Sequence, residues 1–525
     1  HEGGAHEGRR SEGARGPVRG SGATDCAGRG NQSTGPSAGR HCASGPSHAK
    51  TDVTATQRCT KVHDGSRGRA CTIPRMKNVR LWLAVSLFAA AHAHAAAVNV
   101  PVVYDKMPNG LKVVISEAHA APTVTVAVYY GIGFRVEPKG QTGFAHLFEH
   151  MMFQGSEHVK KFEHAKIVEA NGGNLNGSTR LDYTNYYETL PAEGLETALW
   201  LEADRMRSLD VSADNLKNQQ NVVSEEVRAN VLNQPYGAFE WLDLWQNANQ
   251  NWFNAHNFYG DLHDIDAAKI DDVRTFFKTY YAPNNAVLTI VGDVDPAAVR
   301  KLVDKYFASI PQQSIPKRPD VGEPLQTKEK RINQTDKLAN LPALAFGYHL
   351  PDQQSADYAA AVLLDFILQG DDSSRFYQRL VKEKQTSIDW GGGINYELGN
   401  EFDYDGPMLM VSRTTYKPGH TADEILHEVD AIVSDLQQHG PTAREVADAK
   451  VRFRSSFYDS LETTGGKANL LASFALFRDD PSQINKVLPI FDAVTAAQIQ
   501  SAAQKYFGAS NRTSIDRVPA AKEAK

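Results

Sequence analysis

Cysteine is scarce in this sequence and is confined to its beginning. All four cysteines of the 525 residues (Cys26, Cys42, Cys59 and Cys71) lie within residues 1–75, and their spacing fits no zinc module. This stretch is rich in Gly, Arg, Ser and Thr and has almost no apolar periodicity. We interpret residues 1–75 as a disordered or non-native upstream segment, with a Cys/His metal-binding tail as the alternative. Disulfides then contribute nothing to the stability of the remaining chain.

A strong excess of charge of one sign is also missing. The formal net charge is −6, with 22% charged and 41% hydrophobic residues, which is ordinary for a globular protein of two or more domains. No basic stripe with interleaved aromatic residues is present. The sequence therefore predicts no nucleic-acid partner.

Long hydrophobic runs are absent apart from one short segment that begins at Met76. It consists of the basic MKNVR, the apolar LWLAVSLFAAA and the small-residue AHAHAAA. These are the parts of a secretory signal peptide at residues 76–97, too short for a confident membrane span. We expect Met76 to be the true start, cleavage near residues 93–97, a periplasmic or secreted protein, and no stable membrane span afterwards. An uncleaved N-terminal anchor is the alternative.

Two comparable halves follow the signal segment. Residues 98–310 contain strand patterns early and helical patterns at 163–170, 195–208 and 213–232, whereas residues 311–335 form a polar linker punctuated by proline. Residues 336–520 begin with the strand ALAFGYHLP and the helix ADYAAAVLLDFILQG. Their final segment, TAAQIQSAAQKYFGASNRTSI, echoes IDAAKIDDVRTFFKTYYAPNNAVLTI of the first half. We predict that the halves are repeats of one unit.

The stretch GFAHLFEHMMFQG, residues 143–155, carries the chemistry. Its apolar residues recur at the spacing of an amphipathic helix, and His146, Glu149 and His150 occupy the opposite face. Two imidazoles on adjacent helical turns can supply two nitrogen ligands to zinc. Glu149 can then reach a water molecule as a general base without binding the metal.

The third zinc ligand must come from another element. Glu225 and Glu226 lie in the helical pattern NQQNVVSEEVRANVLNQ, and Glu226 shares a stripe with Gln219 while Glu225 is expected to be more exposed. We therefore choose Glu226. A structural zinc that merely braces two helices is the alternative, but such sites usually have four ligands, often thiolates, and this region has no cysteine.

The second half repeats the helix without the ligands. Alignment of residues 154–155 with 369–370, Gln-Gly in both halves, places Ala361, Leu364 and Asp365 at the positions of the metal-helix triad. We predict an active first half and an inactive repeat.

These residues carry a family resemblance. HLFEH is the inverted H-x-x-E-H motif of inverzincins, and the chain resembles the pitrilysin, insulysin and mitochondrial processing peptidase family. In that family a glutamate about 76 residues after the second histidine is the third ligand, and Glu226 lies there (226 − 150 = 76). GGNLNGSTRLDYTNYY resembles the family's edge strand that pairs with substrate backbone. The similarity spans about residues 100–507.

The resemblance implies a fold and a function. The expected fold is α+β, with two similar domains, each a mostly antiparallel sheet packed with helices, forming half of a clam-shaped chamber. The expected activity is that of a zinc endopeptidase with one Zn²⁺ per catalytic domain, acting on peptides or unfolded segments. Asn174, Asn176 and Gly177 would contact the substrate, and the partner would be a second copy or an inactive relative. A non-cleaving subunit that binds peptides or scaffolds a complex is the alternative.

The sequence departs from the family at two positions. Gln219 stands where the family often has a glutamate that supports the third ligand, so less negative charge reaches the metal. Gly177 replaces the usual alanine of the edge strand, which loosens the strand but leaves backbone pairing possible.

Other candidate features have ordinary interpretations. Gly391-Gly392-Gly393 lacks the context of a phosphate loop, and the aromatics of WLDLWQNANQNWF are expected in the core or at an interface. The remaining histidines that could suggest a site are scattered, and we expect them to be surface or core side chains: His158, His164, His256, His263 and His349.

Overall fold

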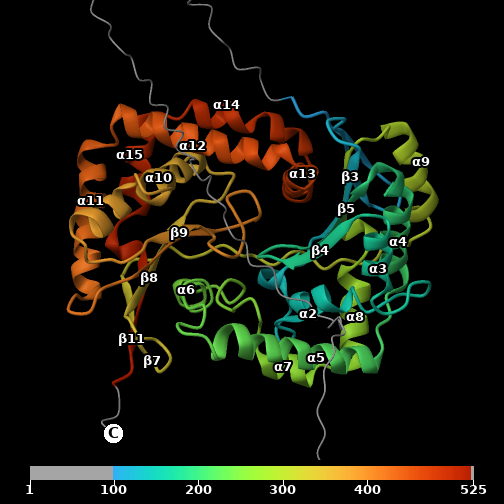
Figure 1. The fold of residues 1–525 in the computed structure, drawn as a ribbon, viewed down its shortest axis with the longest axis horizontal. Helices are drawn as coiled ribbons and strands as arrows, with labels where there is room; N and C mark the ends of the chain where they lie inside the picture. Colours follow the sequence, from blue (N-terminus) through green and yellow to red (C-terminus); the bar gives the residue numbers. More distant parts are fainter. Residues whose placement is uncertain (1–98, 522–525) are drawn as a thin grey trace, which may run out of the picture. The chain divides into compact units, whose positions relative to one another are not determined.

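The computed structural model describes residues 99–521, so the expected upstream segment and signal peptide lie outside the described residues. Two β-sheets surrounded by helices make up this region (Figure 1). The fold is α+β, as the sequence predicts. No helix within residues 99–521 is both long and apolar enough to cross a membrane.

The first sheet has six strands in the order β1-β2-β6-β3-β5-β4. β2 and β6 are parallel, and all other neighbours are antiparallel. The strands are β1 Val103–Lys106, β2 Lys112–Glu117, β3 Thr123–Tyr130, β4 Asn174–Thr179, β5 Thr184–Pro191 and β6 Ala286–Gly292.

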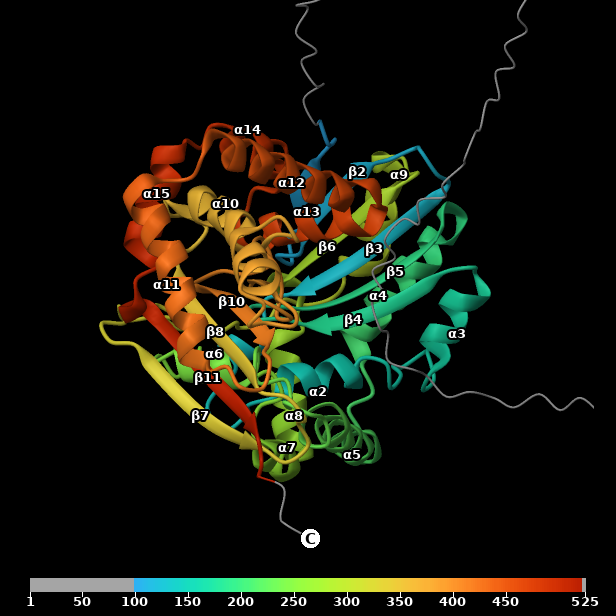
Figure 2. The same cartoon turned by 60° about the vertical axis from the view of Figure 1, so that its left-hand side comes forward.

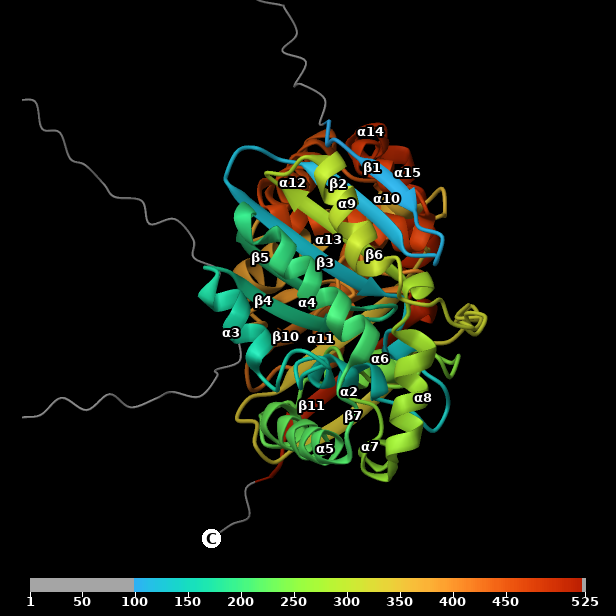
Figure 3. The ribbon, with the colours of Figure 1, turned by 90° about the vertical axis from the view of Figure 1, so that its right-hand side faces the viewer.

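Both faces of the central strand β3 are covered, which explains its almost continuous run of β-branched and aromatic residues. Val124, Val126 and Val128 face a core shared with helices of the first half, α4 (Leu195–Ser208) and α9 (Pro296–Phe307). Figure 3 shows these two helices lying across that face. Tyr129, on the opposite face, belongs to a core shared with the second half.

The remaining helices of the first half surround the site described below. They are α2 Phe144–Met151, α3 Glu163–Ala170, α5 Ala213–Val227, α6 Asp243–Ala248, α7 Leu262–Ala267 and α8 Ile270–Tyr280. The helical pattern at 213–232 changes geometry within its length, because α5 ends at Val227 and continues as the π-helical turns Arg228–Leu232.

The second sheet repeats the first. Its five strands follow the order β7-β11-β8-β10-β9, which matches β2-β6-β3-β5-β4 with the same parallel pair and the same antiparallel neighbours. The strands are β7 Lys330–Asp336, β8 Ala343–Leu350, β9 Gly391–Ile394, β10 Met408–Thr415 and β11 Arg512–Pro519. This shared topology supports the predicted duplication.

The echoed end segments form equivalent structures. α8 leads through a 3-10 turn into β6, and α15 (Ala496–Tyr506) leads through a 3-10 turn into β11. The Asn285 amide donates to the Tyr280 carbonyl at 2.8 Å, and the Asn511 amide donates to the Tyr506 carbonyl at 2.6 Å. The same side chain therefore closes the same turn in both halves.

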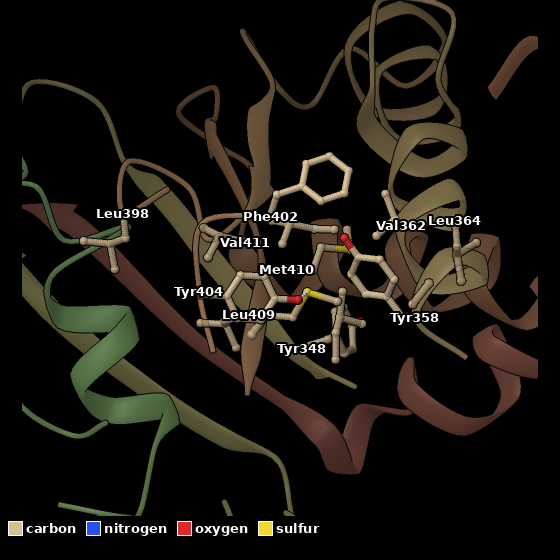
Figure 4. Close-up of a cluster of buried hydrophobic side chains, with 14 of the residues drawn as sticks. Tyr348, Tyr358, Val362, Leu364, Leu398, Phe402, Tyr404, Leu409, Met410 and Val411 are labelled. Atoms are coloured by element: carbon tan, nitrogen blue, oxygen red, sulfur yellow. Dashed lines mark hydrogen bonds between the residues drawn. The ribbon is translucent and has the colours of Figure 1, made fainter. Parts of the chain in front are cut away.

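The second half has its own apolar core (Figure 4). Tyr348 from β8, Val362 and Leu364 from α10, and Met410 from β10 are completely buried in it. Its helices are α10 Tyr358–Gln369, α11 Ala422–His439, α12 Ala443–Glu462, α13 Thr464–Arg478, α14 Val487–Asp492 and α15, together with the π-helical turns Tyr377–Glu383.

The expected linker at residues 311–335 is too long. β7 begins at Lys330, inside it, because the strand KRINQTD is polar and only every second residue is partly buried. As an edge strand it needs few apolar side chains, so its sequence resembles a linker. Only residues up to 329 connect the halves.

Within residues 99–521 the two halves pack together in one compact unit. α13 of the second half lies on the face of the first sheet opposite α4 and α9, as Figure 2 shows above β6 and β3. The Tyr129 hydroxyl donates to the side-chain oxygen Oδ1 of Asn469 at 2.7 Å, and the Thr125 and Thr464 hydroxyls lie 2.7 Å apart. The second half therefore completes the core of the first sheet.

Candidate active site

The helix α2 is fixed at its start by glycine and a buried carboxylate. Gly143 precedes it with φ of 82°, and a Cβ at this position would collide with the backbone oxygen of Tyr259. The Glu137 carboxylate accepts hydrogen bonds from the N–H groups of Gly143 and Ala145 at 2.8 and 2.6 Å. A negative charge at this helix end satisfies its free donors and favours the helix dipole.

Three donor side chains converge between α2 and α5. The rings of His146 and His150 lie 4.8 Å apart. The Nε2 atom of His146 is 3.7 Å from one oxygen of Glu226, and that of His150 is 3.3 Å from the other oxygen. Within residues 99–521 these donors form one of two groups whose atoms all lie within 4.8 Å of one another.

The protonation of the two histidines differs. Burial, assisted by the neighbouring imidazole, lowers the pKa of His146 to about 3, so its ring is neutral, as a metal ligand must be. For His150 burial also acts against the charged form, but hydrogen bonds with Glu226 outweigh it and raise the pKa. The pKa of Glu226 is lowered, because contacts with both imidazoles outweigh the effect of burial.

Glu149 lies beside this group but is not one of the three converging donors. Burial raises its pKa, opposed by the charge of His150, by the nearby Thr179 hydroxyl at the end of β4 and by the charge of Arg180. A carboxylate with a raised pKa is better suited to accept and release a proton near neutral pH.

The donor set suits zinc. Nitrogens of two imidazoles, which can both be neutral, and one carboxylate oxygen match the His₂Glu type of catalytic zinc site. Such a site leaves the fourth coordination position for water. Glu225, the neighbour that could have been chosen instead, is 70% exposed at its side chain and pairs with Arg228. The structure thus places Glu226, not Glu225, opposite the histidines.

Gln219 also belongs to this surrounding. It is 3% exposed on α5, its side-chain amide donates to Asn218 Oδ1 at 2.8 Å, and it lies close enough to His150 to help raise the pKa of that imidazole.

Sequence reasoning missed two aromatic residues that enclose the donors. The Tyr259 hydroxyl donates to Glu226 at 3.3 Å, and the ring of Phe258 lies 4.6 Å from the ring of His146. Both belong to the loop before α7, and no periodic pattern marks them. The aromatic-rich stretch just before them is the available signal.

The predicted substrate strand β4 is at the edge of the first sheet (Figure 2). Among residues 99–521 it pairs only with β5, and Asn174 and Asn176 are exposed. The Asn176 side chain accepts from the N–H of Gly177 at 2.9 Å. A Cβ on Gly177 would lie 3.1 Å from the Tyr186 ring and 3.3 Å from Phe153, so glycine lets these rings pack closely against the strand.

The second three-donor group does not suit a metal. His164, Glu188 and Glu202 are all buried, but Arg205 already binds the Glu202 carboxylate through two hydrogen bonds. Burial raises the pKa of Glu188 to about 8 and lowers that of His164 to about 3, so a protonated Glu188 can donate to the neutral imidazole, 2.9 Å away. Arg205 balances the charge of Glu202, and the Glu188–His164 pair is neutral, so this group needs no metal ion.

The other scattered histidines are ordinary, as expected. His158 and His263 are exposed, and His349 is half-buried. His256 is buried and lies 3.7 Å from Glu137, the carboxylate at the start of α2. It therefore supports the site indirectly.

Comparison with known families identifies the chain. Residues 112–248 match the model described as Insulinase (Peptidase family M16), and residues 267–452 match the Peptidase M16 inactive domain. Together the two models cover more than half of the sequence. The chain belongs to peptidase family M16. The model of the inactive domain falls mainly on the half without the metal donors.

Relatives in this M16 family carry names that include zinc. Zinc protease PqqE of Helicobacter pylori is 26% identical over 456 residues, covering 85% of this chain and 98% of that protein. The uncharacterized zinc protease YmxG of Bacillus subtilis is 23% identical over 403 residues, covering 76% and 94%. The chain is therefore similar to zinc proteases over nearly their whole length, and zinc is the metal of the family.

Solved structures show the same M16 fold. A protease from Helicobacter pylori superimposes with a TM-score of 0.74 at 25% identity, covering 80% of this chain and all of that chain. A peptidase M16 inactive domain structure from Pseudomonas fluorescens gives 0.71 at 18% identity, covering 81% and 99%.

Proposed function

We propose that this protein is a zinc-dependent endopeptidase that hydrolyses peptides or unfolded segments. The supporting observation is the convergence of His146, His150 and Glu226 beside Glu149 and beneath a free sheet edge. A non-cleaving family member would not need a general base at this position.

The chain would hold substrate as an added strand on β4. The edge offers backbone donors and acceptors along Asn174–Thr179, and an extended peptide can satisfy them. Asn176 already contacts backbone at this edge. Folded substrates cannot present a free strand, so unfolded segments are favoured.

Glu149 would carry out the proton transfer. Its carboxylate would accept a proton from the attacking water as the water oxygen bonds to the scissile carbonyl carbon. It would then give this proton to the amine nitrogen when the C–N bond breaks. Tyr259 would hold Glu226 in place through its hydroxyl. Zinc, when bound by the three donors, supplies a Lewis acid that polarises the carbonyl and makes water more acidic.

The test is removal and return of the metal. Purified protein should contain close to one zinc per chain, lose hydrolysis of an unstructured fluorogenic peptide library on chelation, and recover it with stoichiometric zinc. Hydrolysis that survives metal removal would refute the zinc mechanism. Bound zinc and peptide without any hydrolysis would favour the non-cleaving subunit.

Location and assembly belong to the same proposal. The signal pattern at Met76 supports export to the periplasm or beyond. One two-half unit is expected to pair with a second copy or an inactive relative to enclose substrate. Light scattering of the protein alone and with a co-expressed relative, together with the N-terminal sequence of the exported chain, would test both points.

A further inference from the structure

A cavity of about 360 Å³ lies between the start of α13 and the face of the first sheet that α13 covers. Its size is in the range of pockets that bind small ligands or side chains. The first half contributes Tyr129, Ser178, Arg180 and Asn185, and the second half contributes Asp403 and Asn469. Neither half alone forms this cavity.

Arg180 is the cation of the cavity and differs from two buried arginines of the first half. Arg135 pairs with Asp182, and Arg205 pairs with Glu202. Arg180 forms no ion pair with any carboxylate in residues 99–521. Its side chain donates a long hydrogen bond of 3.4 Å to the Thr179 carbonyl and lies close to the Tyr183 hydroxyl. A half-buried guanidinium has donors left for a ligand.

Asp403 does not use this guanidinium. Its carboxylate accepts from the Asn469 amide at 3.0 Å, from the Ser473 hydroxyl at 3.2 Å and from the Asn400 amide at 2.7 Å. Burial raises its pKa, although the charge of Arg180 opposes the rise. The carboxylate is therefore satisfied by neutral donors of its own half.

The cavity is next to the reaction centre. Arg180 directly follows Thr179, whose hydroxyl donates to the Ala145 carbonyl of α2 at 3.4 Å, one residue before the donor His146. Ser178 and Arg180 both line the cavity, as strand alternation places them on the same face. A peptide paired with β4 also presents alternate side chains to this face. A side chain close to the scissile bond would thus point toward the cavity.

We propose that this cavity is a specificity subsite for an acidic substrate side chain, with Arg180 pairing with its carboxylate. The inference rests on the proposed peptidase function. Because the substrate would supply the carboxylate partner that Arg180 lacks, glutamate or aspartate near the scissile bond is preferred over glutamine or lysine.

The experiment uses matched peptides that carry Glu, Gln or Lys at each position flanking the cleaved bond. Wild-type protein is expected to cleave the best Glu peptide about 10- to 100-fold more efficiently than its Gln counterpart, the range for a charge-assisted hydrogen bond. Arg180→Met should abolish this ratio without lowering cleavage of the Gln peptide more than a few fold. Arg180→Glu should reverse the preference toward Lys.

Arg444→Gln is the control, because it also removes one positive charge but lies on an exposed face of α12 with a side chain that is 92% exposed. It should keep the Glu preference. Equal Glu and Gln cleavage in the wild type, or an unchanged ratio in Arg180→Met, would overturn the subsite. A preference for Lys in the wild type would assign the cavity to Asp403 and also overturn it.

A measurement of peptide binding distinguishes a failure of the subsite proposal from a failure of the proposed peptidase function. In a Glu149→Gln background the Kd of the uncleaved Glu peptide should rise about 10-fold or more when Arg180→Met is added. If no peptide is cleaved by the wild type but this rise occurs, the endopeptidase proposal fails and the subsite stands. If peptides are cleaved without any effect of Arg180, only the subsite fails.

Discussion

The two halves share one topology but differ in the helix that follows the central strand. α2 follows β3 and α10 follows β8, yet only α2 carries histidines and the proposed general base Glu149. α10 is covered by α12, α14, α15 and β9, and nearly all of its residues are buried. α2 leaves Glu149 and His150 partly accessible. A helix that supplies metal ligands must keep one face uncovered by neighbouring helices. The same fold leaves this face uncovered in the first half and covers it in the second.

In α10 the residues at the positions equivalent to the metal donors of α2 make other contacts. Asp365 stands where His150 stands in the aligned helix, and it accepts a hydrogen bond from the Gln369 amide at 2.7 Å. The Gln369 amide also donates to the Val411 carbonyl of β10 at 2.9 Å. In the second half these residues bind helix to sheet, which is a structural task.

If the first half alone is catalytic, the largest loss of activity should follow the substitution Glu149→Gln in α2. Loss of the general base is expected to lower kcat/KM by about 10³-fold or more while zinc remains bound. Steady-state hydrolysis and metal analysis of the same preparation measure both effects. Glu169→Gln, an exposed site on α3, is the control and should keep full activity. Undiminished hydrolysis in Glu149→Gln would remove the basis for calling the first half catalytic.

The next effect concerns the third ligand. Glu226→Gln should weaken zinc binding by about 100-fold or more, because a neutral amide is a poor zinc ligand. Competition with a chelating dye gives the affinity. Glu225→Gln changes the neighbouring exposed carboxylate and should leave zinc affinity within about 2-fold. Equal losses in both variants would contradict the assignment of Glu226.

Asp365→Asn tests the helix of the second half. Burial raises the pKa of Asp365 to about 6, so the folded protein binds this proton more tightly than the unfolded chain. The stability that this proton contributes is fully present below about pH 4 and is lost as the pH rises to about 6, by on the order of 2–3 kcal/mol. In Asp365→Asn the free energy of unfolding, measured with denaturant, should no longer show this decrease between about pH 4 and 6. Zinc content and hydrolysis at pH 7 should stay unchanged. A loss of zinc in Asp365→Asn would mean that the second half takes part in metal binding.

The smallest expected effect is at Gln219. Gln219→Glu restores the residue that the family often has and places a negative charge against His150, which should raise zinc affinity by less than about 10-fold. The same dye competition measures it. Asn218→Asp is the control, because it introduces the same charge one position earlier, on an exposed side chain of α5, and should have a weaker effect. An equal gain in both variants would mean that general negative charge, not the contact with His150, strengthens binding.

Helices and strands can be predicted from the sequence where the spacing of apolar residues and the flanking residues mark them locally. The sequence predicts the helices at 163–170 and 195–208 with the bounds that the structure shows, because their apolar spacing and flanking residues are local signals. The donors His146, His150 and Glu226 can be chosen because helix periodicity places them on definable faces. β7 escapes prediction because an edge strand has no such apolar signature.

The sequence by itself determined the zinc-binding pattern of α2, the candidate third ligand and the repeat of two similar halves. These follow from residue types and spacing along short segments. Only the tertiary structure decided that α13 covers the first sheet, that Tyr259 contacts Glu226 and that Arg180 shares a cavity with Asp403. Such contacts join residues far apart in the chain, and their formation depends on how whole sheets and helices pack rather than on local periodicity.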